Sequence, residues 1–154
     1  MGLLPLPAVA VCAGLWACTT VDPGPNFVVP DDQFDADYFF CHVEPELLFA
    51  KKCGPGEPGV DPANGCHFNS SAVSGMALSN HTPVDCNADG HPISRAQIGA
   101  GSAAQGNLQA ASLVMSRDYL TAPIYLRPTG QNHPRVIFDR TDPVVDVIRQ
   151  WAQK

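Results

Sequence analysis

The sequence has few charged residues and no cluster of basic ones. Asp, Glu, Lys and Arg make up 16% of its 154 residues, and the formal net charge is −6. The low charged fraction excludes a disordered polyelectrolyte, because such chains carry much more charge. A nucleic-acid-binding protein needs a basic patch to neutralise phosphates, so this charge distribution also excludes nucleic acid as a partner.

Several motifs of catalysis and metal binding are missing as well. The sequence contains no Gly-x-Ser-x-Gly motif of serine hydrolases and no Asp-x-Asp-x-Asp-Gly pattern of calcium loops. It has no two cysteines separated by two to four residues, the spacing typical of zinc knuckles. A zinc site formed by the cysteines and histidines therefore remains only an alternative.

No apolar run reaches the length of about 20 residues that a transmembrane helix needs. The longest run, residues 3–17, is typical of the hydrophobic region of an export signal. It ends in Leu15-Trp16-Ala17-Cys18, which resembles a bacterial lipobox and implies cleavage before Cys18 and lipidation of its thiol. We predict a signal peptide over residues 1–17, a Pro-rich tether over residues 18–32, and a cell-envelope protein that contacts the membrane through its lipid anchor. A plain secretory signal is the alternative.

Export would place the remaining cysteines in an oxidising compartment. Four cysteines follow the predicted anchor: Cys41, Cys53, Cys66 and Cys86. An even number of cysteines outside the cytosol is typical of disulfides, and four allow three pairings. The residues themselves do not choose among these pairings.

The chain beyond residue 32 favours short helices separated by loops, since it is rich in proline and glycine. Residues 33–52 carry apolar side chains at helical spacing, but Pro45 predicts a kink or two separate pieces. Residues 108–119 favour a second helix. We expect loops over residues 54–65 and 81–107, the latter including a Gly/Ala/Ser-rich surface loop over residues 99–106.

The clearest helix is the last one, over residues 142–153. Asp142 is a good N-cap, and Pro143 is favoured at the first helical position. One apolar stripe follows, formed by Val144, Val147, Ile148 and Trp151. We expect this stripe to pack on the apolar face of the first helix, which contains Val43, Leu47 and Leu48.

The dipeptide Cys-His occurs twice, at Cys41-His42 and Cys66-His67. The second copy follows a Gly/Pro-rich loop and a helix with the pattern Val43-x-Pro45-x-Leu47-x-x-x-Lys51-Lys52-Cys53. Together with the terminal Val147-Ile148-Arg149-Gln150-Trp151, these features resemble a class I cytochrome c domain. The resemblance implies a small all-α fold over residues 33–154, with long Gly/Pro-rich loops and crossed N- and C-terminal helices.

The resemblance also implies a covalent haem c. Cys53 and Cys66 would be the attachment thiols and His67 the proximal iron ligand, because the family requires Cys-His adjacency. Twelve residues separate the two cysteines here, whereas the family usually has two. Two alternatives therefore stay open: attachment through Cys66 alone, and a haemless fold in which Cys53 and Cys66 form a disulfide.

The distal ligand in related domains lies on a turn shortly before the last helix. Asn132-His133-Pro134 occupies that place, so His133 is the first choice for the distal ligand. Met115 is the second choice and Met76 the third. Bis-histidine ligation would give a lower reduction potential than ligation by histidine and methionine.

The implied function is one-electron transfer at the cell envelope, with other redox proteins as partners and no enzymatic activity. With Cys53 and Cys66 assigned to haem, Cys41 and Cys86 remain as a structural disulfide. The alternative is a haemless envelope lipoprotein, stapled by disulfides, with a structural or binding role.

Overall fold

The computed structural model describes residues 33–54, 66–69 and 75–154. All of them belong to the unit Asp32–Lys154. The predicted signal peptide, the predicted lipidation site at Cys18 and the predicted tether lie outside the described residues. Within the described ranges the regular structure is helical, apart from one isolated antiparallel bridge between Cys86 and Pro92.

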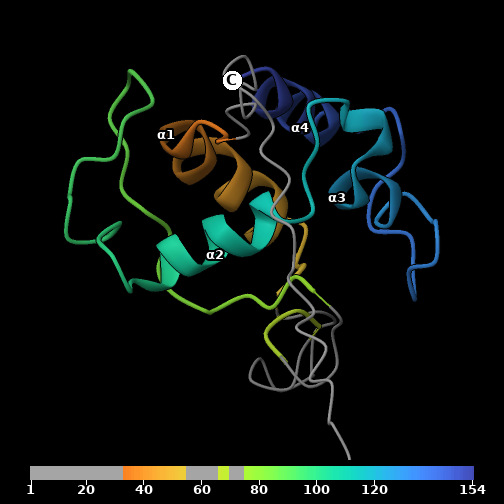
Figure 1. The fold of residues 1–154 in the computed structure, drawn as a ribbon, viewed down its shortest axis with the longest axis horizontal. Helices are drawn as coiled ribbons and strands as arrows, with labels where there is room; N and C mark the ends of the chain where they lie inside the picture. The colour runs from red at the N-terminus through yellow and green to blue at the C-terminus, as the bar shows by residue number, and fades with distance from the viewer. Residues whose placement is uncertain (1–32, 55–65, 70–74) are drawn as a thin grey trace, which may run out of the picture. The chain divides into compact units, whose positions relative to one another are not determined.

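The first helix begins as an α-helix and continues as a π-helix. α1 spans Ala36–Tyr38, and η1 spans Phe39–Phe49 (Figure 1). The Asp35 carboxylate caps the start by accepting the Tyr38 N–H at 2.8 Å. Pro45 lies inside η1, and its carbonyl accepts the Ala50 N–H at 3.0 Å. The chain therefore passes Pro45 as one helical run instead of two pieces, with hydrogen bonds five residues apart.

α2 spans Ala103–Ser112 and begins inside the segment predicted as a surface loop. That prediction is wrong from Ala103 onward. The Ser102 hydroxyl accepts the Gln105 N–H at 3.2 Å, so the chain has an N-cap that is followed directly by two alanines. Both features favour helix more strongly than the nearby glycines oppose it. Two short helices follow, η3 over Tyr119–Thr121 and α3 over Pro123–Leu126.

α4 spans Val144–Gln153 and packs on η1 (Figure 1). The Asp142 carboxylate accepts the Val144 N–H at 3.0 Å. The predicted apolar stripe is buried, and so is the opposing face of η1; these residues are Val144, Val147, Ile148, Trp151, Val43, Leu47 and Leu48. The Trp151 indole also donates to the Asp35 carbonyl at 3.0 Å. The expected packing of the last helix on the first is therefore present.

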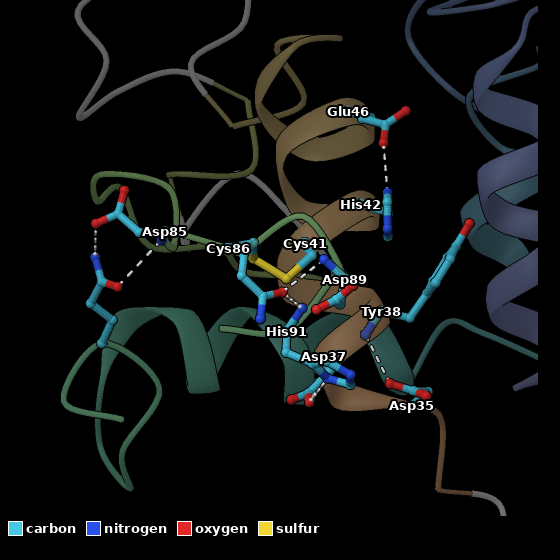
Figure 2. The surroundings of a disulfide bond; sticks show 12 residues. Asp35, Asp37, Tyr38, Cys41, His42, Glu46, Asp85, Cys86, Asp89 and His91 are labelled. Carbon is cyan, nitrogen blue, oxygen red and sulfur yellow. Dashed lines mark hydrogen bonds and ion pairs between the residues drawn. A yellow bond between two sulfur atoms is a disulfide. The ribbon is translucent and has the colours of Figure 1, made fainter. Parts of the chain in front are cut away.

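A disulfide joins η1 to the segment that follows residue 80. It links Cys41 to Cys86, with the Cα atoms 5.8 Å apart (Figure 2). This is the pairing that the sequence predicted. α2 also contacts η1, so η1 lies at the centre of the described fold. None of the helices in the described ranges is long and apolar enough to span a bilayer.

Candidate functional site

The end of the first helix lies directly beside the second Cys-His dipeptide. The Cys53 carbonyl accepts the His67 N–H at 3.1 Å, and the Gly54 carbonyl accepts the Phe68 N–H at 3.2 Å. The chain segments that carry Cys53 and Cys66 are therefore adjacent, although twelve residues separate the two cysteines in the sequence. The long spacing does not keep the two predicted attachment residues apart.

The His67 imidazole faces the imidazole of His133. The two ring centres are 6.3 Å apart, and the ring planes lie within 16° of parallel. His67 follows the first helix, whereas His133 lies on the turn before α4, so the pair joins two distant parts of the chain. These are the two histidines that the sequence predicted as axial ligands of one iron.

Both imidazoles are anchored in the same way, through Nδ1. The Nδ1 of His67 lies 2.6 Å from the Met76 carbonyl oxygen, and that of His133 lies 2.6 Å from the Arg135 carbonyl oxygen. A carbonyl only accepts hydrogen bonds, so each Nδ1 carries a proton, and in the neutral form of either ring the lone pair is on Nε2. Histidines that bind metals typically have this arrangement, because the bond at one nitrogen orients the other toward the metal.

Burial sets the protonation states at this site. It lowers the pKa of His67, and the neighbouring His133 adds to the decrease, so the neutral imidazole is favoured. The neutral form is the one that binds a metal. Burial also raises the pKa of the Cys53 thiol to about 12, with a smaller contribution from Cys66. Cys53 is therefore a protonated thiol at neutral pH.

Cys53 and Cys66 are both free thiols, the first buried and the second exposed. The Cys53 sulfur lies 3.5 Å from the Leu47 carbonyl oxygen, at the end of η1. The Cys53–Cys66 disulfide that the haemless alternative requires is not formed. Within the described ranges, no group of three or more His, Cys, Asp or Glu side chains is arranged to hold a metal ion. The site is instead a pair of imidazoles with two thiols beside it.

The two methionines predicted as weaker choices take other positions. Met115 is buried in the hydrophobic core, whereas the ring that faces His67 is that of His133. Met76 is buried too, and its backbone carbonyl is the group that contacts His67. Met76 therefore contributes to the site through its main chain.

A second polar cluster was not predicted from the sequence. Glu44, on η1, is fully buried and contacts His81 and Asn107, at 2.9 Å in each case. One signal was available, since Glu44 directly follows Val43 and lies four residues after Phe40, on the apolar stripe of the first helix. An acidic residue on such a stripe predicts a buried carboxylate that needs partners.

Comparison with known proteins yields no significant match: no family model, no curated protein and no solved structure resembles this chain. The function must therefore be argued from the residues and their geometry.

Proposed function

We propose that this protein is an exported, lipid-anchored haem c protein that carries out one-electron transfer and has a small all-α cytochrome c-like fold. One observation carries the proposal. His67 and His133 face each other at 6.3 Å between ring centres, each with Nδ1 bonded to a backbone carbonyl. Two imidazoles held in this way suit a metal that takes two axial ligands.

The spacing of the rings supports haem iron between them. A bond from a metal to an imidazole nitrogen is about 2.0–2.1 Å long, so two imidazoles on opposite sides of one metal have ring centres about 6 Å apart. The two ring centres in the structure are 6.3 Å apart. His67 would be the proximal ligand and His133 the distal ligand.

The thiols support covalent attachment. Cys53 and Cys66 are both free, and the hydrogen bond from the His67 N–H to the Cys53 carbonyl places their segments side by side. Attachment through both thiols fits this placement. Attachment through Cys66 alone is the second possibility, because Cys66 is exposed whereas Cys53 is buried.

When bound, haem supplies one-electron chemistry through an iron that alternates between the ferric and ferrous states. The chain's own residues position the ligands and set the environment. The Met76 and Arg135 carbonyls hold the two imidazoles in one tautomer, and burial keeps His67 neutral. The hydrogen bonds at Nδ1 also make each imidazole a more basic ligand, which tunes the reduction potential.

The location and the partners belong to the same proposal. Lipidation of Cys18 would hold the protein at the cell envelope, and the tether over residues 18–32 would give the domain reach. The partners would be other redox proteins that exchange electrons through brief contacts. No bond is made or broken in a substrate, so the protein would not be an enzyme.

A haemless envelope lipoprotein is the alternative, and the Cys41–Cys86 disulfide supports it as well. That disulfide stabilises a small exported domain whether or not haem is present. The free Cys53 and Cys66 thiols favour the haem protein over this alternative.

The test is the absorption spectrum of the full-length protein, expressed together with a haem c maturation system. After denaturation in alkaline pyridine, a reduced α-band of the c type that stays with the polypeptide would support covalent haem. The position of that band distinguishes attachment through two thioether bonds from attachment through one. A colourless protein would contradict the proposal and favour the alternative.

Variants of the two Cys-His dipeptides give the matched control. His67→Ala and Cys66→Ala are expected to lower the band strongly, because covalent attachment in this family requires an adjacent Cys-His pair. A band that remains in Cys66→Ala but moves in position would indicate a single thioether at Cys53. His42→Ala is expected to leave the band unchanged, since the His42 ring contacts Glu46 and Tyr38 near the disulfide. Equal loss in all three variants would indicate misfolding and not loss of a ligand.

A further inference from the structure

A buried carboxylate in the described fold has no role in the proposed electron transfer. Glu44 is fully buried, and its Oε1 atom lies 2.9 Å from both His81 Nε2 and Asn107 Nδ2. Its other oxygen, Oε2, has no hydrogen-bond partner in the part of the chain that the structure describes. Burial of an ionised carboxylate with one unpaired oxygen is costly, so the state of Glu44 is sensitive to its surroundings.

One short segment joins this cluster to the histidine site. The Met76 carbonyl accepts from His67 Nδ1, and the Leu78 N–H donates to the His67 carbonyl at 2.8 Å. Further along, the Ser79 N–H donates to Asn107 Oδ1 at 2.7 Å, and the Ser79 carbonyl accepts from Asn107 Nδ2 at 3.0 Å. The position of residues 76–79 against His67 therefore depends on Asn107.

His81 completes the connection at the other end of the segment. Its Nε2 contacts Glu44, and its Nδ1 lies 2.7 Å from the Thr82 carbonyl. Aromatic rings lie along the same path, because Phe49 is 5.4 Å from the His81 ring and 6.4 Å from the Phe68 ring. Phe68 directly follows His67. The Glu44 cluster and the histidine site thus share both a backbone segment and a packed aromatic contact.

The charged groups around Glu44 are few. His81 is the one titratable neighbour that acts on it within the described ranges, and α2, which supplies Asn107, contains no charged residue. His42 and Glu46, on η1 itself, bond to each other at 3.1 Å. Burial raises the pKa of Glu44, although the bonds from Asn107 and His81 oppose the increase.

We propose that Glu44, His81 and Asn107 are positioning residues for the haem ligand His67, and that the protonation of Glu44 is coupled to the oxidation state of the site. The inference rests on the proposed function. Asn107 holds the segment that bears the Met76 carbonyl, and Glu44 is bonded to both Asn107 and His81. A change in charge at Glu44 alters this hydrogen-bond network and, through it, the ligand.

Each redox step exchanges one electron and a fraction of one proton. On reduction, one electron comes from the redox partner protein, and Glu44 takes up a fraction of one proton from solvent. Oxidation returns both, because the additional positive charge of the oxidised site favours the ionised carboxylate. The extended segment from Met76 to His81 spans at most about 18 Å. For a separation of about 15 Å between Glu44 and the oxidised centre, and an effective dielectric constant of about 20, one unit charge would change an equilibrium about sixfold.

The experiment measures the reduction potential of the haem-loaded full-length protein against pH. In the wild type the potential is expected to fall as the pH rises above the ordinary range of glutamate. The total change would correspond to about sixfold in the reduction equilibrium constant. Glu44→Gln keeps the shape of the side chain and removes its titration, so its potential should be independent of Glu44 ionisation and nearly flat over that range.

Glu46→Gln is the matched control, since it removes one exposed carboxylate from the same helix, two residues away. Its potential should follow pH as the wild type does. A pH dependence that is the same in the wild type and Glu44→Gln, or one that disappears in Glu46→Gln, would overturn the inference.

A second measurement needs no haem. In the unloaded full-length chain, the NMR chemical shift of the Leu78 amide reports its bond to the His67 carbonyl. That shift should titrate with Glu44 in the wild type and not in Glu44→Gln; an identical titration in both would contradict the coupling. A colourless protein with the expected Leu78 titration would refute the proposed function but retain the network. A haem protein without this titration would support the proposed function and refute the network.

Discussion

The two Cys-His dipeptides of this protein have the same chemistry in sequence and opposite surroundings in the fold. At the first, Cys41 is bonded to Cys86, and His42 pairs with Glu46 near the surface (Figure 2). At the second, Cys66 is a free thiol, and His67 is partly buried with its ring opposite that of His133.

The acceptor at Nδ1 separates the two histidines most clearly. His42 Nδ1 contacts the carboxylate of an exposed side chain, and solvent and salt weaken such a contact. His67 Nδ1 contacts the backbone carbonyl of Met76, which the surrounding fold holds in place. A fixed backbone acceptor gives a fixed ring direction, and an axial ligand requires a fixed direction.

Carboxylates also gather at the disulfide end. Asp35, Asp37 and Asp89 line a surface hollow together with the His42 and His91 rings. His91 Nδ1 contacts Asp37 at 2.8 Å (Figure 2). These groups are partly or fully exposed, so the contacts contribute little energy. A Cys-His dipeptide therefore becomes a candidate ligand through the groups that fix its ring, and the contacts at the disulfide end are structural.

The largest effect on stability is expected from removal of the Cys41–Cys86 disulfide. Replacing Cys41 and Cys86 by serine removes a crosslink between residues 45 positions apart, so the unfolded chain gains entropy. We expect the free energy of unfolding to fall by about 4 kcal/mol, measured by urea unfolding. Cys66→Ser, at an exposed thiol, should change it by less than about 0.5 kcal/mol in the unloaded chain. Similar losses in both would mean that the two regions do not differ.

The second effect disturbs the histidine region. A Cβ at Gly54 would overlap the ring of Phe68, the residue after His67. Gly54→Ala is therefore expected to cost about 1–3 kcal/mol of stability and to reduce haem incorporation, measured by urea unfolding and the pyridine spectrum. Gly106→Ala is the control, because nothing lies near that position in α2. It should stabilise the protein by about 0.5–1 kcal/mol, and a loss as large as that of Gly54→Ala would count against the packing at Phe68.

The third effect concerns pH. Burial raises the pKa of Glu44 in the folded chain above its value in the unfolded chain. Its contribution to stability is therefore complete below the unfolded pKa and is lost as the pH rises through the folded one. Urea unfolding at pH 5 and pH 8 should show Glu44→Gln gaining stability relative to the wild type at the higher pH. Parallel pH dependences in the two proteins would show that Glu44 does not titrate in this way.

The smallest effect is expected at the first dipeptide. His42→Ala removes an exposed contact with Glu46, which should be worth less than about 0.5 kcal/mol in urea unfolding. Haem content should not change. A large loss of haem in this variant would reverse the roles assigned to the two dipeptides.

The sequence predicted those parts of the fold that depend on local pattern. The last helix has its cap at Asp142 and its apolar stripe within ten residues, so both could be identified without the rest of the chain. The start of α2 was missed because a Gly/Ala/Ser-rich segment suggests a loop, whereas the Ser102 cap and the alanines after it favour helix. The π-helical winding through Pro45 has no signature in the composition.

Some features of the candidate site could likewise be predicted from the sequence, and others could not. The resemblance to a cytochrome c domain, which rests on the Cys-His dipeptide and the last helix, implied that His67 pairs with His133, and the structure brings the two rings together. Whether they bind haem stays a prediction. The Met76 carbonyl that orients His67 and the network at Glu44 were not predictable, because each contact joins residues from different segments. The carbonyl that orients His133 belongs to Arg135, two residues away, but no local pattern distinguishes that turn.

The sequence by itself determined which segments favour helix and which residue types are available for chemistry, because caps, stripes and dipeptides act within about one helical turn. Only the tertiary structure decided which thiols pair, which remain free and which acceptor each histidine meets. The pairing of the thiols and the position of His67 depend on contacts between residues far apart in the chain, whereas the acceptors of His42 and His133 lie within four residues. Cys53 meets His67 across the Gly/Pro-rich segment, and Glu44 meets Asn107 across 63 positions.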